Sequence, residues 1–456
     1  MLKYLFENKN PLFWIIFHFI LGGLSILSPW VLIPWFYLVL LTSLPSILKR
    51  TVNHFVKLSG LIVYVISFEL LGRMSGTSPF IPYEMGKYLF FILLCYGILI
   101  GYRRGWIGLL MLFLLVPALL IDASGQVGVK HIIFNLLGPV NVALAIVYFK
   151  NQLVSTEELK SLLRLLSLPA ISVLAFVIIK TPDFENIEFE LGANFKTAGG
   201  FGSNQVSTVL GLGAFLVYWF WRNKWHLSGY RWLDLGLLIL FTIRGLLTFS
   251  RGGMIGGAIA IFVLIFYQTA TSDYRWSPQR AVFNVIKAVP VVMIFFLVFA
   301  YANNISGGNL ALRYQGETPG TVAGYREKTL NVVFTNRVNV FIDDLELWRK
   351  HPFLGVGVGA SMYLRDDTRR VAPHLELSRL LSEHGLLGAF YFLILCGLGY
   401  KLFKKAHSTH YDAILLAIFV LALFTTFHSA MRTYISPLLI GLSMLIVYEP
   451  NEVEQL

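Results

Sequence analysis

Fourteen runs of largely apolar residues divide the chain, and they restrict its possible folds more than any other feature. Each run approaches the ~20 residues with which an α-helix crosses the ~30 Å hydrocarbon core of a membrane. The runs lie at 11–28, 30–48, 55–72, 86–102, 105–121, 132–149, 165–180, 204–221, 232–249, 252–269, 283–302, 386–403, 411–428 and 433–448. Only 14% of the residues are charged, whereas soluble domains carry about 25%. We therefore expect an all-α polytopic integral membrane protein with about 12–14 transmembrane helices.

The positions of the lysines and arginines predict the orientation of the chain. If the N-terminus is cytoplasmic, seventeen of them, from Lys49 to Lys405, lie in short inside connections. Seven lie in short outside connections, and they are Arg73, Lys87, Lys130, Lys180, Lys196, Arg251 and Arg432. Cytoplasmic connections carry the excess of positive charge, so we expect an even number of spans and both termini in the cytoplasm. No small-residue cleavage site precedes or ends the first run, which is therefore expected to be a retained span.

The net charge of +12 also has a topological explanation, because the basic residues cluster between the apolar runs. We therefore expect no nucleic-acid partner. Cys95 and Cys396 both lie inside apolar runs. Their positions argue against a disulfide framework and against a zinc site.

The longest connection between apolar runs covers residues 303–385 and is expected on the outer, periplasmic face. A connection of about 80 residues is uncommon unless it is functional or disordered. Because this one has helical periodicity and contains Trp348, we expect a small, mostly helical loop domain. It would separate a transmembrane bundle at 1–302 from C-terminal transmembrane helices and a short cytoplasmic tail at 386–456. A shorter outer segment, 181–203, is acidic.

Arg337 stands at the start of a predicted helix in this loop. The apolar stripe of that helix, at i, i+4 and i+7, consists of Phe341, Leu345 and Trp348. Thr335 or Asn336 can cap the first turn, and Arg337 lies on the face of the stripe. A guanidinium on a buried face needs an anionic or carbonyl partner. The alternatives are a salt bridge to Asp343 or Asp344 and the binding of an anionic ligand.

The run His351–Gly359 carries a glycine at every second position from Gly355 onward. Alternate glycines resemble a nucleotide-binding loop, but a dinucleotide fingerprint requires a preceding strand within a βαβ unit. No such unit is predicted here. We expect instead a tight turn in which one backbone segment approaches another closely.

A second loop helix is predicted from Pro373 to Gly385, leading directly into the twelfth apolar run. Proline suits the first helical turn, and glycine suits a C-terminal stop. His374 and Glu376 would lie in the first turn, where the positive end of the helix disfavours an imidazolium and leaves His374 able to accept a proton. The alternative is an interfacial helix whose polar face is merely solvated.

Arg251 lies at the outer mouth between two apolar runs. Arg244 would lie on the same helix face, about two turns deeper, if the helix is continuous. Arginine within a span is costly and usually functional, and a snorkelling Arg251 is the alternative, which explains Arg244 less well. The glycine pairs at 252/256 and 253/257 are expected to serve close helix packing.

Further polar residues are predicted near the outer face, where they could line a substrate site. They are Asn204, Gln205, Arg313, Arg379, His428 and Arg432. Singly, each such residue is more often structural than catalytic.

Taken together, several arginines, a histidine and a carboxylate are expected on the outer side of a membrane bundle. Arginine forks suit phosphate oxygens, and a lipid-accessible groove suits a polyprenyl tail. This combination predicts a polyprenyl-diphosphate-linked substrate. No Asp-rich pair or Cys/His cluster indicates a metal, so arginine would stabilise the leaving diphosphate.

Three motifs follow one another around the long loop. They are Ser250-Arg251-Gly252-Gly253, the stretch from Arg337 through Trp348 to His351-Pro352-Phe353-Leu354-Gly355-Val356-Gly357, and His374 with Leu380–Gly388. In this order they resemble the Ser-Arg-Gly, the Arg…Trp…His-Pro-x-x-Gly-x-Gly and the His…Leu-Leu-x-Glu-x-Gly-x-x-Gly of the O-antigen ligase and Wzy-type O-antigen polymerase superfamily of bacterial membrane glycosyltransferases. The resemblance covers residues 200–390, and the first half of the chain is similar in hydropathy only.

The resemblance implies a multi-span, GT-C-like fold with a periplasmic loop in the bacterial inner membrane. The family transfers a glycan from undecaprenyl diphosphate to an acceptor hydroxyl without a metal, so no cofactor is expected. Carried over, Arg251 and Arg337 would bind the diphosphate, and His374 would act near the acceptor hydroxyl. Arg244 is a further candidate for binding the diphosphate because of its place within a span. Many members have asparagine after this histidine, whereas Leu375 and then Glu376 follow here. The base could therefore be His374, Glu376 or both.

The acceptor is left open between lipid A core, for a ligase, and a second lipid-linked glycan, for a polymerase. The rival class is a transporter or flippase for an anionic lipid or solute, which would use the arginines for binding only. Transporters more often have internal repeats and broken spans in matching halves, and no such pairing is visible in the sequence. A structural or signalling membrane protein is the third alternative.

Overall fold

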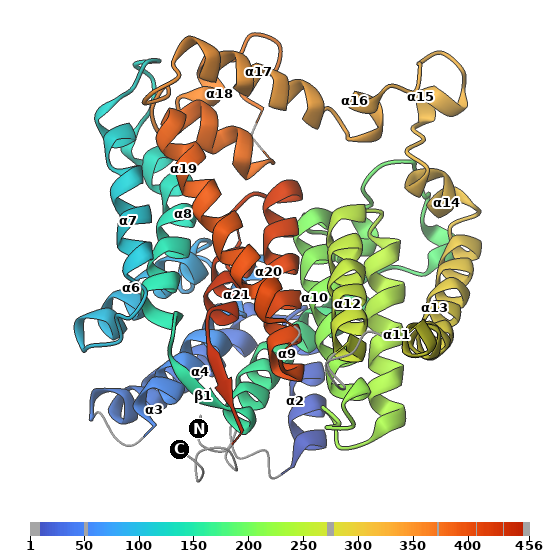
Figure 1. The fold of residues 1–456 in the computed structure, drawn as a ribbon. Coiled ribbons are helices and arrows are strands. Elements are labelled where there is room, and N and C mark those ends of the chain that lie inside the picture. Colours follow the sequence, from blue (N-terminus) through green and yellow to red (C-terminus); the bar gives the residue numbers. More distant parts are fainter. Residues whose placement is uncertain are drawn as a thin grey trace.

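The fold is built almost entirely of helices (Figure 1). The computed structural model describes residues 10–49, 53–270, 278–371, 374–406, 408–431 and 433–449. In these ranges two three-residue strands, β1 (Leu153–Ser155) and β2 (Ile446–Tyr448), pair in parallel. The remaining elements are α-helices and short 3-10 turns, which agrees with the expected all-α class.

The helices follow the predicted apolar runs closely. Those before the long loop are α2 (Pro11–Leu24), α3 (Leu32–Leu48), α4 (His54–Ile66), α5 (Glu69–Ser75), α6 (Met85–Leu99), α7 (Trp106–Leu115), α8 (Val129–Phe149), α9 (Thr156–Lys180), α10 (Ser203–Arg222), α11 (Arg231–Leu247), α12 (Arg251–Ala270) and α13 (Pro278–Ile305). After the loop come α19 (Glu376–Lys405), α20 (His410–His428) and α21 (Ile435–Ser443). Each of the fourteen runs contains at least part of one of these helices.

Within the described ranges, six helical stretches are long and apolar enough to cross a membrane, judged by length and composition. They are Pro29–Leu48, His54–Ser75, Val129–Phe149, Thr156–Lys180, Glu376–Lys405 and His410–His428. Five further apolar helices have 10–17 residues. The prediction of an all-α polytopic membrane protein is thus confirmed, whereas the number of spans stays a prediction.

The last predicted run, 433–448, does not form one long helix. Helix α21 has 9 residues, and the chain then enters β2, which pairs with β1 just before α9. A helix of that length rises about 14 Å, at 1.5 Å per residue, which is about half of the hydrocarbon core. The expectation of a full-length helix over this run is therefore wrong, because the chain ends the helix to pair its two strands.

Helix α12 is held between α10 and α20 by two pairs of glycines. A Cβ atom at Gly253 or Gly257 would lie 2.2 Å or 2.6 Å from backbone atoms of α10. At Gly252 or Gly256 it would lie 2.5 Å or 3.0 Å from side chains of α20. Both faces of α12 therefore rely on the absence of a side chain, and the prediction that these glycines serve close helix packing is confirmed.

Replacing Gly253 by alanine is expected to lower the stability of the purified protein by about 1–3 kcal/mol, the usual cost of overpacking a well-packed core. The new methyl group would press on the backbone of Ser207 and push α12 away from α10. Thermal unfolding in detergent measures the effect. The matched control is Gly236→Ala on α11, where a Cβ would meet nothing within 4 Å, and it should unfold no earlier than the parent protein. Equal melting of both variants would contradict the packing argument.

The chain breaks between α11 and α12 instead of continuing as one helix. Phe249 has φ 57°, in the left-handed region, and its buried ring stacks on Phe189 at 5.5 Å. The Thr248 hydroxyl accepts the Ser250 amide at 3.2 Å and so supports the turn. Arg244 and Arg251 therefore do not lie on one continuous helix, because the buried Phe249 redirects the chain between them.

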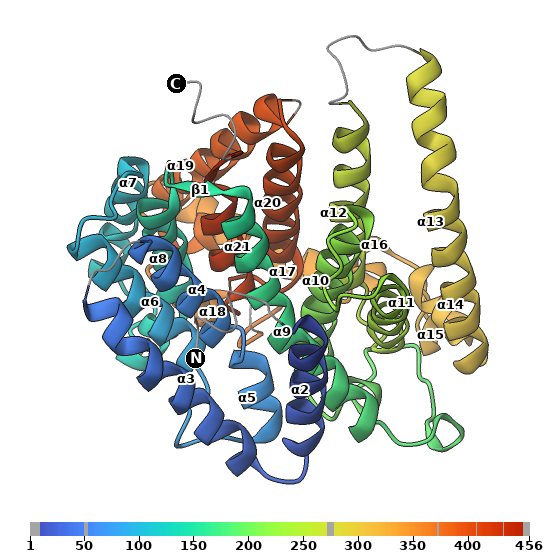
Figure 2. The same cartoon turned by 90° about the horizontal axis from the view of Figure 1, so that it is seen from below.

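The long loop folds into five short helices that lie together on one face of the bundle (Figure 1). They are α14 (Asn309–Tyr314), α15 (Pro319–Val322), α16 (Leu330–Val333), α17 (Arg337–Lys350) and α18 (Ser361–Leu364). Helix α2 begins and strand β2 ends on the opposite face (Figure 1). Seen from that opposite face, α13 stands at the edge of the bundle, where it packs against α11 (Figure 2).

The buried face of α17 differs from the predicted stripe. Its buried residues are Val340, Asp343, Asp344 and Leu347, while Phe341, Leu345 and Trp348 are half-buried. The Asp344 carboxylate pairs with the guanidinium of Arg365 at 2.8 Å, and the Asp343 carboxylate accepts the amide and hydroxyl of Thr368 at 2.9 Å and 2.6 Å. The predicted stripe was wrong by about one residue, because these partners allow two aspartates to be buried.

The glycine run of the loop packs backbone against backbone, as predicted. Gly355 and Gly357 both have positive φ, and a Cβ at either would lie 2.4 Å or 1.9 Å from the backbones of Glu383 and Ile121. The Val356 amide donates to the Ser382 carbonyl at 2.9 Å. This turn therefore fixes the loop against the first part of α19. Helix α19 then bends at its own Gly385 (φ 62°) and continues into the bundle.

Candidate functional site

Three arginines from separate elements lie close together where the loop meets the bundle. Arg251 is the first residue of α12, Arg313 belongs to the last turn of α14, and Arg337 is the first residue of α17. Burial, together with the charges of Arg251 and Arg337, lowers the pKa of Arg313 to about 10. Burial and the charge of Arg251 likewise lower the pKa of Arg337. We call Arg251, Arg313 and Arg337 the arginine cluster.

Backbone carbonyls hold two members of the arginine cluster in place. The Arg251 guanidinium donates a short hydrogen bond to the carbonyl of Val333. The Arg313 Nε donates to the carbonyl of Phe249 at 3.4 Å. Val333 itself is positioned by Gly316, where positive φ (88°) lets the backbone lie so near that a Cβ would be 2.9 Å from the valine side chain. The loop is thus folded onto the end of the bundle through these residues.

The two residues before Arg337 have an unusual backbone conformation. Thr335 and Asn336 both have positive φ, and Asn336 occupies the N-cap position without a side-chain hydrogen bond to the helix. The predicted cap is therefore present by position only. Among the described residues, the Arg337 side chain forms neither a hydrogen bond nor an ion pair. The salt bridge to Asp343 or Asp344, one of the alternatives from the sequence, does not occur because those carboxylates have other partners.

The arginine cluster has no acidic counterpart in the part of the chain that the structure describes, since none of its three members forms an ion pair with Asp or Glu there. Arg313 is only 6% exposed, and the other two are half-buried. Bringing cations together and away from water is unfavourable unless an anion joins them. The cluster is therefore chemically suited to bind a multiply charged anion, and arginine is the side chain that best matches phosphate oxygens.

A row of polar side chains on α10 lies beside the start of α12. The Asn204 amide oxygen accepts the Ser250 hydroxyl at 2.7 Å, and the Ser207 hydroxyl donates to Ser250 at 3.1 Å. The Thr208 hydroxyl is 3.0 Å from Nε2 of His428 on α20. These contacts explain why Asn204 and His428, both predicted as lining residues, lie next to Arg251.

His428 connects the polar row to the loop. Gly252 packs so closely on its ring that a Cβ there would be 2.5 Å away, and Arg337 is near enough to act on the imidazole electrostatically. The residues that follow His428 then turn back toward the start of α19. The Ala430 amide donates to the carbonyl of His374 at 3.0 Å. The turn after α20 thereby links the arginine cluster to His374.

His374 lies just before α19 and not in its first turn. The helix begins at Glu376, with Leu375 at the N-cap position, and His374 is half-buried in an extended connection. The expectation of both residues within the first helical turn is therefore wrong for His374. Its support comes from backbone pairing with the turn at Ala430, and a helix-end argument for its protonation no longer applies.

The Glu376 carboxylate is fully buried and both of its oxygens have partners. One accepts the amide of Met431 at 3.0 Å, and the other forms a short ion pair with Arg379. Arg379 also donates to the carbonyl of Asn135 on α8 at 2.7 Å. Glu376 and Arg379 therefore connect α19 to α8 and to the turn after α20.

Two further predicted residues do not enlarge the arginine cluster. Arg244 lies on the side of α11 that faces α13, with its guanidinium 5.0 Å from the ring of Phe184 and near Tyr301. The structure does not bring it into contact with Arg251, Arg313 or Arg337. Arg432 lies outside the described residues.

A second group of charges is buried between α5, α6 and the start of α10. Arg73 pairs with Glu69 at 2.5 Å and donates to Gln205 at 2.9 Å, while Lys87 pairs with Glu84 at 2.7 Å. Arg73 and Lys87 are 9% and 2% exposed. The expectation that both belong to short outside connections is therefore wrong. They lie in helices, and carboxylates within reach compensate their charges.

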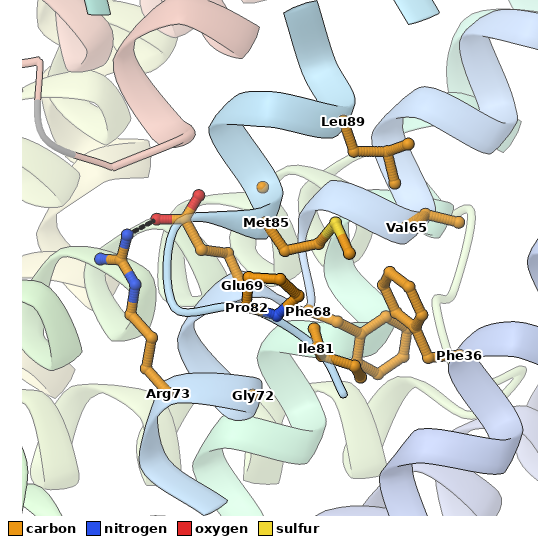
Figure 3. A pocket seen from close by; sticks show the side chains of 11 residues that line it. Phe36, Val65, Phe68, Glu69, Gly72, Arg73, Ile81, Pro82, Met85 and Leu89 are labelled. Carbon is orange, nitrogen blue, oxygen red and sulfur yellow. Dashed lines mark ion pairs between the residues drawn. The ribbon is translucent and has the colours of Figure 1, made fainter. Parts of the chain in front are cut away.

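This ionic group borders a small pocket, which Glu69 and Arg73 line together with Phe36, Phe68 and Met85. Figure 3 shows the Arg73 guanidinium directed toward the Glu69 carboxylate at one side of this pocket. About 10 Å³ of the pocket admits the centre of a water molecule, which is room for about one water. The pocket is too small for a lipid or sugar. We interpret the group as a structural connection of α5, α6 and α10.

Sequence reasoning missed several parts of the site. The carbonyl of Val333, the hydroxyls of Ser207 and Thr208 and the phenol of Tyr314 all lie at or beside the arginine cluster. Tyr314 follows Arg313 directly, which was a usable signal. The other contacts depend on how distant segments of the chain pack together, and no local sequence pattern predicts them.

These features define a helical membrane protein with a cationic site where a long loop meets the ends of several bundle helices. Residues 235–393 match the model of the family described as O-antigen ligase. The match confirms the resemblance to the O-antigen ligase and Wzy-type superfamily and includes the whole arginine cluster, His374 and Glu376. This is a family of glycosyl-transferring membrane enzymes. No curated protein and no solved structure is similar enough to match.

Proposed function

We propose that the protein transfers an undecaprenyl-diphosphate-linked glycan to an acceptor hydroxyl on the periplasmic face of the bacterial inner membrane. The observation that carries this proposal is the arginine cluster, whose three cations meet without an acidic partner in the described ranges. A diphosphate supplies the missing negative charge, and its polyprenyl tail can remain in the bilayer beside the bundle. The O-antigen ligase match over the same residues supports this substrate class.

In the proposed complex, Arg251, Arg313 and Arg337 bind the diphosphate. Their role continues during the reaction, because negative charge grows on the diphosphate as the bond to the sugar breaks. Fixed donors directed at that developing charge lower the barrier. Arg244, which the sequence suggested as a further ligand, is given no part in binding, because its contacts lie on the α13 side of α11.

The proposed reaction forms one bond and breaks one at the anomeric carbon, and it transfers one proton from the acceptor hydroxyl to a base. The oxygen of the acceptor hydroxyl attacks the anomeric carbon, the bond from that carbon to the diphosphate oxygen breaks, and the diphosphate leaves with the electron pair. The hydroxyl proton passes to a base. We assign this role to His374, because the carboxylate oxygens of Glu376 are already occupied by Met431 and Arg379. Glu376 is then the positioning residue that holds His374 against the turn after α20.

The proposed orientation places the long loop and the arginine cluster in the periplasm. The start of α2 and the end of β2 lie on the face opposite the loop (Figure 1). The excess of lysine and arginine in the connections assigned to the cytoplasm supports the same orientation. Undecaprenyl-linked glycans and their acceptors would then meet the site from the outer leaflet.

The proposal is tested with the full-length protein purified in detergent and incubated with an undecaprenyl-diphosphate-linked glycan. A ligase is expected to produce a larger band only when lipid A core is added, whereas a polymerase is expected to produce a ladder from the lipid-linked glycan alone. Either product supports the proposed enzyme. Unchanged glycan under both conditions, with intact folded protein, would contradict it and would favour the transporter or flippase alternative.

A further inference from the structure

Tyr314 ends helix α14 and lies next to the arginine cluster. Its hydroxyl oxygen is buried and has no hydrogen-bond partner in the described parts of the chain. The charges of Arg251 and Arg313 both act on this hydroxyl. The ring packs edge-on against Phe299 of α13, with 5.5 Å between the ring centroids. The side chain is therefore anchored by its ring, while its polar end is left facing cations.

A buried hydroxyl without a partner is uncommon, because removing it from water costs free energy that a hydrogen bond normally offsets. Two guanidinium groups cannot accept a hydrogen bond from a phenol, because arginine has donors only. Burial raises the pKa of Tyr314, although Arg251 and Arg313 lower it in part, so the phenol keeps its proton. An anion can satisfy the phenol and both guanidiniums together, because it accepts the hydrogen bond of the phenol and compensates the two positive charges.

We propose that Tyr314 is a binding residue for the diphosphate, and that its hydroxyl donates a hydrogen bond to the phosphate oxygens held by Arg251 and Arg313. This inference rests on the proposed function and deepens it by adding a neutral donor to the arginine cluster. A fourth cation would increase the repulsion among the arginines in the absence of substrate. A phenol adds a charge-assisted hydrogen bond to the complex without adding charge to the free protein.

The proposal predicts opposite effects on binding and on stability when the hydroxyl is removed. In Tyr314→Phe the ring still packs on Phe299, and the unsatisfied buried hydroxyl is gone. The free protein should therefore be as stable as the parent or slightly more stable. The bound state should lose a hydrogen bond to a charged group. A residue that served packing alone would show neither loss of binding nor this contrast.

The experiment measures binding of farnesyl diphosphate to the purified full-length protein by calorimetry, with thermal unfolding of the ligand-free protein in parallel. We expect Tyr314→Phe to weaken binding about 10-fold or more while the unfolding temperature stays equal or rises. Tyr325→Phe is the matched control, because Tyr325 is 78% exposed on the same loop, and it should bind like the parent protein.

Three results would overturn the inference, and they are distinguishable. If Tyr314→Phe binds farnesyl diphosphate like the parent while Arg251→Ala does not bind it, Tyr314 is not a ligand and the proposed function stands. If the parent protein itself does not bind farnesyl diphosphate, both the inference and the proposed diphosphate site fail. A parallel loss of binding and of ligand-free stability would assign Tyr314 to structure and also contradict the inference.

Discussion

Glycan transfer is expected to fall about 100- to 1000-fold when Arg251 is replaced by alanine, the usual effect of removing one fixed donor from a developing anion. The guanidinium begins α12, is tied to the loop through the carbonyl of Val333, and acts electrostatically on Arg313 and Arg337. Arg251→Lys should recover only part of the rate, because an ammonium keeps the charge and loses the planar fork that fits two phosphate oxygens. Product bands from purified protein and lipid-linked glycan give the measurement.

Two controls make the result specific. Arg326→Ala removes an exposed arginine of the same loop and should leave transfer within about twofold, since exposed substitutions have small effects. Arg244→Ala tests the boundary of the site, because Arg244 contacts Phe184 and not the arginine cluster. If Arg251→Ala transferred glycan at the parent rate while remaining folded, the arginine cluster would not be the diphosphate site. If Arg244→Ala lost as much activity as Arg251→Ala, the site would extend along α11.

The arginine cluster shows which parts of the candidate site can be predicted from the sequence. The presence of Arg251 at the end of an apolar run and of Arg337 at the start of a loop helix is a local signal, because charge is costly beside a membrane and therefore informative. No local sequence pattern predicts that Arg313 completes the arginine cluster. Its position depends on contacts between distant segments, because Arg313 donates to the carbonyl of Phe249 and Arg251 donates to the carbonyl of Val333.

Two of the wrong expectations concern buried charges, because a pattern of apolar residues does not show which charged side chains have partners in the fold. The helix stripe on α17 was predicted from apolar residues, yet Asp344 is buried because Arg365 pairs with it from another segment. Arg73 and Lys87 were counted as loop charges, yet both are buried because Glu69 and Glu84 lie beside them. Counting charges along the chain assumes that each one faces water, and these do not.

The structure at the start of α19 distinguishes His374 from Glu376 as candidates for the base, which the sequence could not do. His374 and Glu376 are two residues apart, so either could have been the base. In the fold, Glu376 faces inward to Arg379 and the amide of Met431, while His374 stays in the extended connection outside the helix. A base must release its proton after each cycle, and a half-buried residue outside the ionic core is better suited to this than a fully buried carboxylate with both oxygens occupied.

His374→Ala is therefore expected to reduce transfer by about 100- to 10,000-fold, the range over which a general base contributes, while binding of farnesyl diphosphate stays close to that of the parent. This split between binding and chemistry follows because the arginine cluster remains intact. His131→Ala is the control, since His131 is an exposed histidine near the same loop, and it should keep the parent rate.

Glu376→Gln separates a positioning role from a catalytic one. Glutamine keeps an acceptor for the Met431 amide but removes the closer of the two carboxylates paired with Arg379, whose other partner, Glu383, lies 4.0 Å away. Breaking a buried ion pair typically destabilises by about 3–5 kcal/mol. We expect a lower unfolding temperature with partial transfer, because His374 still accepts the proton once the segment is folded. If instead Glu376→Gln abolished transfer without loss of stability, and His374→Ala transferred glycan normally, the carboxylate would be the base. The surrounding contacts of Glu376 would then have to open during each cycle.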